Sequence, residues 1–293
     1  MNRRSFVKFT IFLVMLACFS TATFAQATAQ QALDNNFGKL PPNQISTWGL
    51  SGVRTEIALQ YLIDPSLVKD KLPQGFSPFT ANDVAQHDSD TAKWLETHPL
   101  YRGYLFGTLI FTSLDSLVID DSKVNRHGPA NYASWWVFGK ATSPLDKAAL
   151  GEVGVQLAAW YPDTGVDRRK LVSDPTIEFA KVEVANTRPG EWLVHLKIKG
   201  GEITGDCREE GERTEMKYPV PAYSTIFEGA PDPSRYTIYT YYGHYERHMH
   251  ADWQFTGNHL LARSLSAMKI IYPFHTTMED SWRARAGLYK LEK

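Results

Sequence analysis

The segment from Tyr241 to Phe255 carries the densest group of side chains that could do chemistry. It reads YYGHYERHMHADWQF. Side chains alternate between faces along a strand, so His248 and His250 would share a face with Glu246 and Asp252. Residues two apart on a strand lie about 6.6–6.8 Å apart, which allows two imidazoles to bind one metal ion.

His248 and His250 admit two interpretations. A catalytic zinc site needs three protein ligands plus water, and this segment supplies two good ones. We therefore predict no tight metal site and no cofactor. Imidazoles beside carboxylates have raised pKa values and titrate near neutral pH, so both histidines are candidate general acid–base residues. An exposed polar face on an edge strand is the alternative.

A second reactive group lies at the end of the run Arg168-Arg169-Lys170. Neighbouring cations depress the pKa of a lysine amine and make it more nucleophilic, so Lys170 is a candidate catalytic residue. The alternative is an exposed basic turn.

These residues need strands to position them, and the chain has many. Apolar and alternating runs predict strands, with Trp135 and Trp136 on opposite faces of one of them. Short helices are expected after Asp64-Pro65, within a polar insertion over residues 80–102 (capped by Ser89 or Asp90) and over residues 258–272. The insertion is a lid or a surface decoration. The pattern indicates one α+β, mainly β domain. The strand runs cover residues 53–63, 103–119, 132–138, 153–161, 177–184, 192–198 and 281–291.

Two segments resemble the acetoacetate decarboxylase family. Residues 153–162, VGVQLAAWYP, resemble the family's active-site strand, which ends in an aromatic residue and a proline. Arg54, seven residues before Tyr61, is followed by a short helix ending in Leu72-Pro73, as in the family's N-terminal segment. The resemblance implies a curved sheet or barrel enclosing an apolar pocket that Arg54 faces.

The same comparison argues against the family's reaction. There the proline is followed by two lysines, one of which forms a Schiff base, whereas this chain has Asp163 and Thr164, neither of which can form an imine. The family's two pocket glutamates also lack a clear match. Their nearest positions are Gly107 or Thr108 and Ser134.

We therefore expect a protein that binds a small carbonyl- or carboxylate-bearing molecule without Schiff-base decarboxylation. One alternative is a lyase- or hydratase-type enzyme that uses His248 and His250 or Lys170. The other is a structural or interaction protein with a vestigial pocket. The candidate ligand-binding residues are an arginine, an aspartate and aromatic residues: Arg54, Tyr61, Trp135, Trp136, Trp160 and Asp163.

The N-terminus reads as a signal peptide over residues 1–25. A basic start precedes an apolar run from Phe9 to Phe19, too short to span a membrane, and then small residues around Ala25. The start also resembles the twin-arginine signal, so Sec and twin-arginine export both stay open. We expect a periplasmic or secreted protein without stable membrane insertion after cleavage.

Residues 26–50 are interpreted as a spacer, and residues 51–293 as a single domain. The formal net charge of −1 does not favour nucleic acid as a partner. A small-molecule ligand is the expected partner, and the sequence leaves homo-oligomer formation open.

Overall fold

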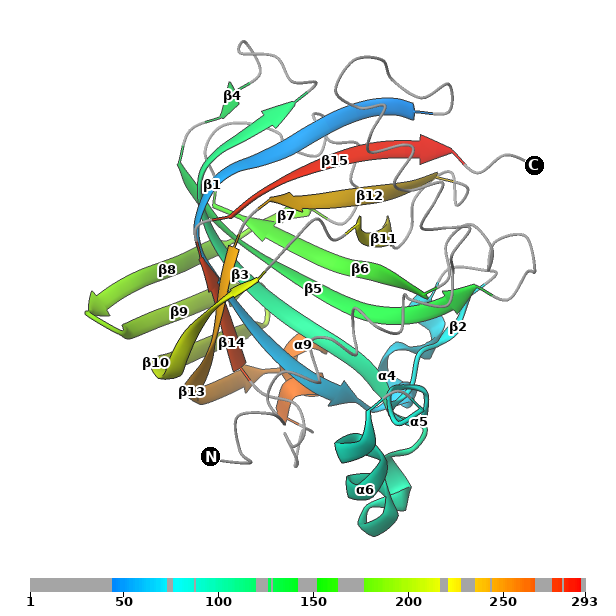
Figure 1. Ribbon diagram of the computed structural model, residues 1–293. Coiled ribbons are helices and arrows are strands. Elements are labelled where there is room, and N and C mark those ends of the chain that lie inside the picture. The colour runs from blue at the N-terminus through cyan, green and yellow to red at the C-terminus, as the bar shows by residue number, and fades with distance from the viewer. Residues whose placement is uncertain are drawn as a thin grey trace.

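The computed structural model describes residues 44–72, 76–86, 88–119, 126–127, 129–141, 152–162, 177–216, 221–227, 235–242, 244–266, 276–280 and 282–290. These residues form mostly β-strands with a few short helices (Figure 1), so the predicted mainly β, α+β class is confirmed. The helices are α4 (Pro65–Val68), η1 (Lys69–Lys71), α5 (Ala81–Val84), α6 (Ser89–Thr97), η2 (Pro99–Tyr101) and α9 (Leu260–Ser266).

The strands include every region in which alternating or apolar runs predicted one. Strand β1 begins at Gln44, inside the range interpreted as a spacer. The strands are β1 (Gln44–Ile63), β2 (Phe76–Pro78), β3 (Leu105–Ile119), β4 (Arg126–His127), β5 (Ala130–Ala141), β6 (Glu152–Tyr161), β7 (Ile177–Phe179), β8 (Lys181–Arg188), β9 (Glu191–Ile198), β10 (Gly201–Met216), β11 (Pro221–Phe227), β12 (Arg235–Tyr242), β13 (His244–Gly257), β14 (Thr276–Asp280) and β15 (Trp282–Lys290).

The strands belong to one sheet that curls back on itself. Its order runs β3-β5-β6-β11-β12-β15-β1, and β1 also pairs directly with β3. From β1 the sheet continues through β14, β13, β10 and β9 to β8. In Figure 1, β12 and β15 lie on one side of β3, β5 and β6, and β8, β9, β10 and β13 lie on the other. The two faces of β3, β5 and β6 are therefore turned towards different strands.

The hydrophobic core fills one of those two sides. Alternate residues of β1, β3, β5 and β6 pack against β8, β9, β10, β13 and α9, and the core includes Leu59, Phe111, Val137, Val194 and Leu261. Each of these five side chains is fully buried. Burying such a side chain contributes about 1.5–3 kcal/mol, so this packing fixes which face of the four strands turns away from β12 and β15.

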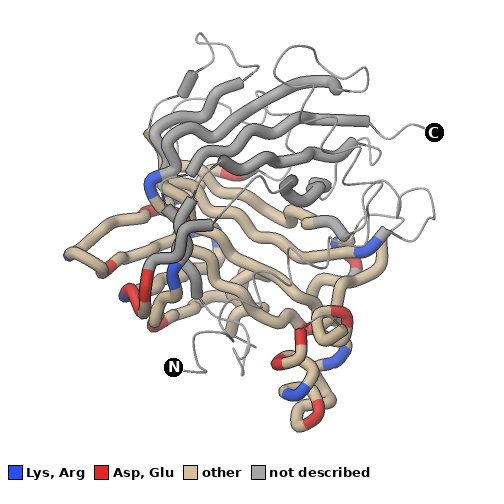
Figure 2. Tube along the Cα trace, viewed as in Figure 1, with Lys and Arg blue, Asp and Glu red and all other residues tan. Residues whose placement is uncertain are grey.

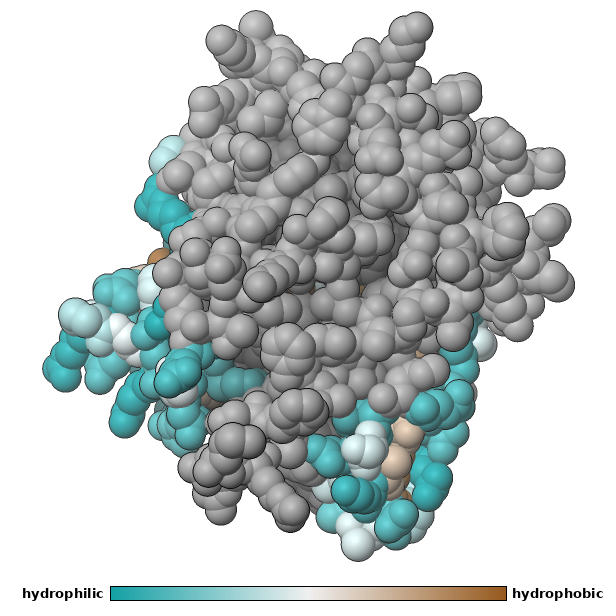
Figure 3. Space-filling model, viewed as in Figure 1, coloured by the Kyte–Doolittle hydropathy of each residue, from teal (hydrophilic) through white to brown (hydrophobic). Residues whose placement is uncertain are grey.

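Along β8, β9, β10 and β13, side chains that point into the core alternate with side chains that point away from it. Met249 is buried in the core, whereas its neighbour His250 is exposed. Charged residues of both signs mark these strands and the helices α5 and α6 (Figure 2), and the described surface in Figure 3 is mostly hydrophilic. Among the described residues, no helix has both the length and the apolar character needed to cross a membrane.

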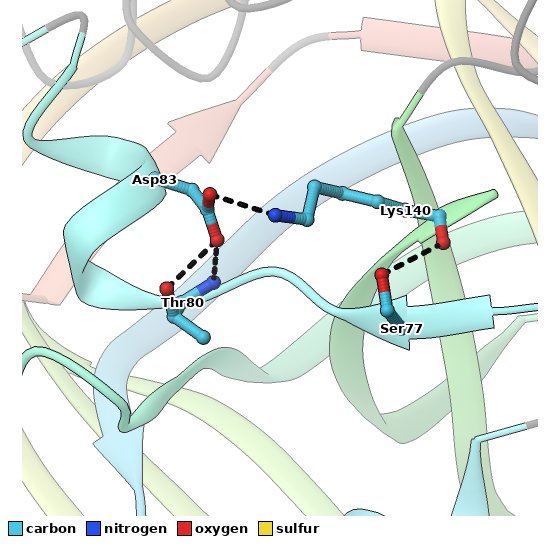
Figure 4. A network of polar contacts seen from close by, with 4 residues as sticks. All are labelled: Ser77, Thr80, Asp83 and Lys140. Atoms are coloured by element: carbon cyan, nitrogen blue, oxygen red, sulfur yellow. Dashed lines mark hydrogen bonds and ion pairs between the residues drawn. The ribbon is translucent and has the colours of Figure 1, made fainter. Parts of the chain in front are cut away.

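A polar network joins the insertion over residues 80–102 to the sheet (Figure 4). The backbone N–H and hydroxyl of Thr80 donate to Asp83 Oδ2 at 2.8 and 2.7 Å. Lys140 Nζ on β5 donates to Asp83 Oδ1 at 2.7 Å, and Ser77 Oγ donates to the carbonyl of Lys140 at 3.4 Å. The start of α5 is therefore tied to the end of β5.

The helix α6 starts one residue later than its capping residue, which is Asp88 and neither Ser89 nor Asp90. The Asp88 carboxylate accepts from the backbone N–H of Thr91 at 2.7 Å. The predicted cap was wrong because the helix begins at Ser89, so the N-cap position, whose side chain accepts the N–H three residues later, belongs to Asp88.

Candidate functional site

The face of β1, β3, β5 and β6 opposite the core carries polar side chains, and we call it the inner face. Strand register orders these residues in three rows across the strands. The first row is Glu56, Thr112, Tyr132 and Tyr161; the middle row is Ala58, Ile110, Ser134 and Ala159; the third row is Gln60, Thr108, Trp136 and Gln156. A bulge in β6 at Leu157 brings Gln156 and Ala159 to the same face.

The polar side chains of the third row are almost fully buried. Gln60 is 2% exposed, Thr108 6% and Gln156 4%. In the middle row, Ser134 accepts a hydrogen bond of 2.7 Å from Trp136 Nε1. In the described structure, however, Gln60 Oε1 is buried without a hydrogen-bond partner. Such an unpaired group costs about 1–3 kcal/mol, so a ligand that pairs with the Gln60 amide would be favoured.

The middle row is low between two taller rows. Ala58, Ser134 and Ala159 have small side chains. Ala58 and Ile110 are half-buried, although Glu56 and Gln60 on either side of Ala58 are buried. Ser134 and Ala159 of the same row are buried, so the accessible surface of the middle row lies over β1 and β3.

The insertion covers one end of the inner face. Leu62, Phe106 and Phe138 continue that face and pack against Trp94 and Leu95 of α6. The Phe106 and Phe138 ring centroids are 5.1 Å apart. The insertion is thus packed onto the inner-face side of the sheet, and its apolar contacts close that end.

Glu56 supplies a carboxyl group to the first row. Its residue is 9% exposed, and Thr112 Oγ1 donates to Glu56 Oε2 at 3.1 Å. Burial raises the pKa of Glu56 to about 7, against the smaller lowering effect of the Thr112 hydrogen bond. A carboxyl group that titrates near neutral pH can both accept and donate a proton.

Sequence reasoning missed Glu56, although a signal was present. It lies two residues after Arg54 in the family-like segment, and it alternates with the apolar residues Ile57 and Leu59. A charged residue within an apolar strand, on the face opposite the core, indicates a polar interior.

Three of the predicted aromatic residues lie in the hydrophobic core: Tyr61, Trp135 and Trp160. The Tyr61 hydroxyl lies 3.2 Å from Ser264 Oγ on α9, and Trp160 Nε1 donates to Glu178 Oε2 at 3.2 Å. Burial raises the pKa of Tyr61. These residues connect the sheet to its neighbours, and the structure brings only Trp136 of the predicted aromatic group to the inner face.

Arg54 lies at an irregularity of β1. The register with β3 shifts between Val53 and Thr55, which makes Arg54 the extra residue of a bulge. Its side chain is exposed, two residues from Glu56. Bulges re-aim side chains, so the direction of Arg54 does not follow from strand alternation. The candidates Asp163 and Lys170 lie outside the described residues.

His248 and His250 lie on β13, which is separated from β1 by β14, and His248 and Ala58 are both in register with Thr277 of β14. Met249 between the two histidines is buried in the hydrophobic core. His250 Nε2 lies 3.8 Å from Asp252 Oδ1, and both side chains are largely exposed. Within the described ranges, no three His, Cys, Asp or Glu side chains lie close enough to hold a metal ion.

Comparison with known proteins places the fold. No protein-family model matches the sequence, and no curated protein is significantly similar to it. The solved structure of acetoacetate decarboxylase from Legionella pneumophila has 10% sequence identity and a TM-score of 0.52, covering 89% of this chain and 95% of that one. The chain therefore has an acetoacetate decarboxylase-like fold, which confirms the resemblance seen in the sequence.

Two further solved structures are similar at lower TM-scores. An acetoacetate decarboxylase-like enzyme from Sphingomonas wittichii has 9% identity and a TM-score of 0.48, covering 86% of this chain and 94% of that one. The enduracididine biosynthesis enzyme MppR, complexed with pyruvate, has 10% identity and a TM-score of 0.48, covering 86% and 91%.

Proposed function

We propose that the inner face binds a small carbonyl- or carboxylate-bearing molecule. The observation that carries this proposal is the buried polar surface around the low middle row, with the unpaired Gln60 Oε1 at its edge. The two ends of an amide are similar in shape, so Gln60 can turn its Nε2 towards a ligand oxygen. The Ser134 and Thr108 hydroxyls supply further donors or acceptors.

The ligand is held without a covalent bond in this proposal. Asp163 and Thr164 stand where the family-like strand would need lysines. On the described part of β5, Lys140 Nζ forms an ion pair with Asp83 Oδ1 at 2.7 Å. Arg54, exposed at its bulge near Glu56, is the proposed partner for a ligand carboxylate.

We place this activity outside the cytoplasm. The basic start, the apolar run and the small residues around Ala25 support export and a periplasmic or secreted protein.

Calorimetric titration tests the binding proposal. Pyruvate bears both functional groups, and acetone and propionate each carry one of them, so the three probes separate the two contributions. Gln60→Leu removes one neutral hydrogen-bonding group worth about 0.5–1.5 kcal/mol, so it should weaken pyruvate binding about 2- to 12-fold. Ala58→Phe should abolish binding because it fills the low row.

Gln254→Leu is the matched control, since Gln254 is exposed on β13 beyond the core. It should leave pyruvate affinity unchanged. Circular dichroism must show that all three variants fold. Absence of binding by any probe, or equal loss in Gln60→Leu and Gln254→Leu, would refute the inner face as the ligand site.

A further inference from the structure

Glu56 is a titratable group that ligand binding alone does not require. Its carboxyl group lies in the first row of the inner face, where its strand neighbour Thr112 donates to it and the rings of Tyr132 and Tyr161 stack at a centroid distance of 5.0 Å. Strand pairing places the uncharged Thr112 of β3 on one side of Glu56 and Glu279 of β14, its register partner, on the other. Burial raises the pKa of Glu56 by more than the Thr112 hydrogen bond lowers it.

The geometry of the inner face sets Glu56 across from the ligand-binding amide. Glu56 and Gln60 are four residues apart on one strand, about 13 Å at Cα, and both belong to the inner face. Ala58 between them is small and half-buried. A ligand a few carbon atoms long would lie over Ala58 with one end near each of the two side chains.

We propose that Glu56 removes and returns a proton at the carbon atom next to the carbonyl group of a bound 2-oxo acid. This inference rests on the proposed function, because it needs a ligand on the inner face. It assigns a reaction class, enolisation, and a catalytic residue to that site.

The step balances without a redox partner. The Glu56 carboxylate takes a proton from the carbon, and the C–H electron pair becomes a C=C bond. The carbonyl π electrons move to the oxygen, whose negative charge is stabilised by a hydrogen bond from the Gln60 amide or by a proton from solvent. The reverse step returns a proton to carbon, so the observable result is exchange of that hydrogen with solvent.

The experiment follows hydrogen exchange by NMR. Pyruvate or 2-oxobutyrate is incubated with the full mature protein in D2O, and loss of the proton signal next to the carbonyl is timed. The protein should accelerate exchange over buffer. The rate should rise with pH through a midpoint near 7, since the base form of Glu56 is its carboxylate.

Three variants separate catalysis from structure. Glu56→Gln should lower the exchange rate at least 100-fold while changing pyruvate affinity less than about threefold, because general base catalysis contributes 10²–10⁴-fold. Glu56→Asp should retain part of the rate. Glu183→Gln makes the same chemical change on β8, where the side chain is 41% exposed, and should behave as wild type.

The outcomes distinguish this inference from the proposed function. If either 2-oxo acid binds but does not exchange, or if Glu56→Gln exchanges at the wild-type rate, the assignment of Glu56 is wrong and ligand binding stands. If neither acid binds, both fail. A pH midpoint that Glu56→Gln leaves in place would assign the proton transfer to another group.

Discussion

A buried carboxyl group lowers the stability of a protein when it ionises. Glu56 has a pKa of about 7 in the folded chain, against 4.5 for an unperturbed glutamate. Between these values the folded state binds more protons than the unfolded state, so stability is greatest at low pH and falls as pH rises towards 7. Ionisation of Glu56 therefore destabilises the folded state at neutral pH.

Glu56→Gln should remove this dependence. From pH 5 to pH 8, the unfolding free energy of the variant should gain about 2–3 kcal/mol relative to wild type, since one pKa unit corresponds to about 1.4 kcal/mol. Urea denaturation at both pH values measures it. Equal pH dependence in the two proteins would show that the carboxyl group titrates normally.

Residue roles were only partly predictable from the sequence. Alternation placed Trp135 and Trp136 on opposite faces, and the structure confirms this: Trp135 lies in the core and Trp136 bonds Ser134. Alternation cannot say which face turns inward, because that depends on strands far away in the chain. Tyr61 and Trp160 were therefore placed among ligand contacts, and Glu56 was overlooked.

Among the elements, the insertion over residues 80–102 packs against the inner-face side of the sheet. Its apolar residues cover Leu62, Phe106 and Phe138, and its polar network holds α5 against β5. Burial of the Asp83 carboxyl opposes ionisation, but hydrogen bonds from Lys140 and Thr80 outweigh it and lower the pKa of Asp83. This stabilisation is present at neutral pH and is lost as pH falls through the folded-state pKa.

Lys140→Ala should therefore destabilise the fold by about 1 kcal/mol at pH 7, a modest value because the lysine is 37% exposed. The loss should shrink as pH falls through the folded-state pKa of Asp83, which is lowered from its ordinary value of 3.8. Thermal unfolding measures the effect, with Lys93→Ala on the exposed side of α6 as control. A similar change in both variants would mean that the network does not anchor the insertion.

The positions of helices and strands along the sequence were more predictable than the pairing between strands. Asp64-Pro65 predicted the start of α4, and the structure shows the backbone N–H of Ser66 donating to Asp64 Oδ1 at 2.8 Å. Such signals are local. The pairing of β1 with β3, β14 and β15 joins residues more than forty positions apart, and no local pattern encodes it.

At the scale of the whole molecule, the fold is that of an acetoacetate decarboxylase-like protein, and its sequence differs where that family would place lysines. Two short segments were enough to predict the fold, because they resemble a family whose fold the chain shares. These segments could not predict the inner face, because each of its rows contains one residue from each of four strands.

The proposed export concerns the whole chain. N-terminal sequencing of the mature protein should begin between Gln26 and Gln30, because small residues surround Ala25 at the end of the apolar run. An intact Met1 in a cytoplasmic fraction would contradict the signal peptide.

A crystal structure of the protein grown with pyruvate would show directly whether the inner face binds this ligand. Density for pyruvate should lie over Ala58, with one oxygen in hydrogen-bonding range of the Gln60 amide and the methyl group towards Glu56. Density beside His248 and His250, or an inner face without pyruvate when the protein is saturated, would contradict ligand binding over Ala58.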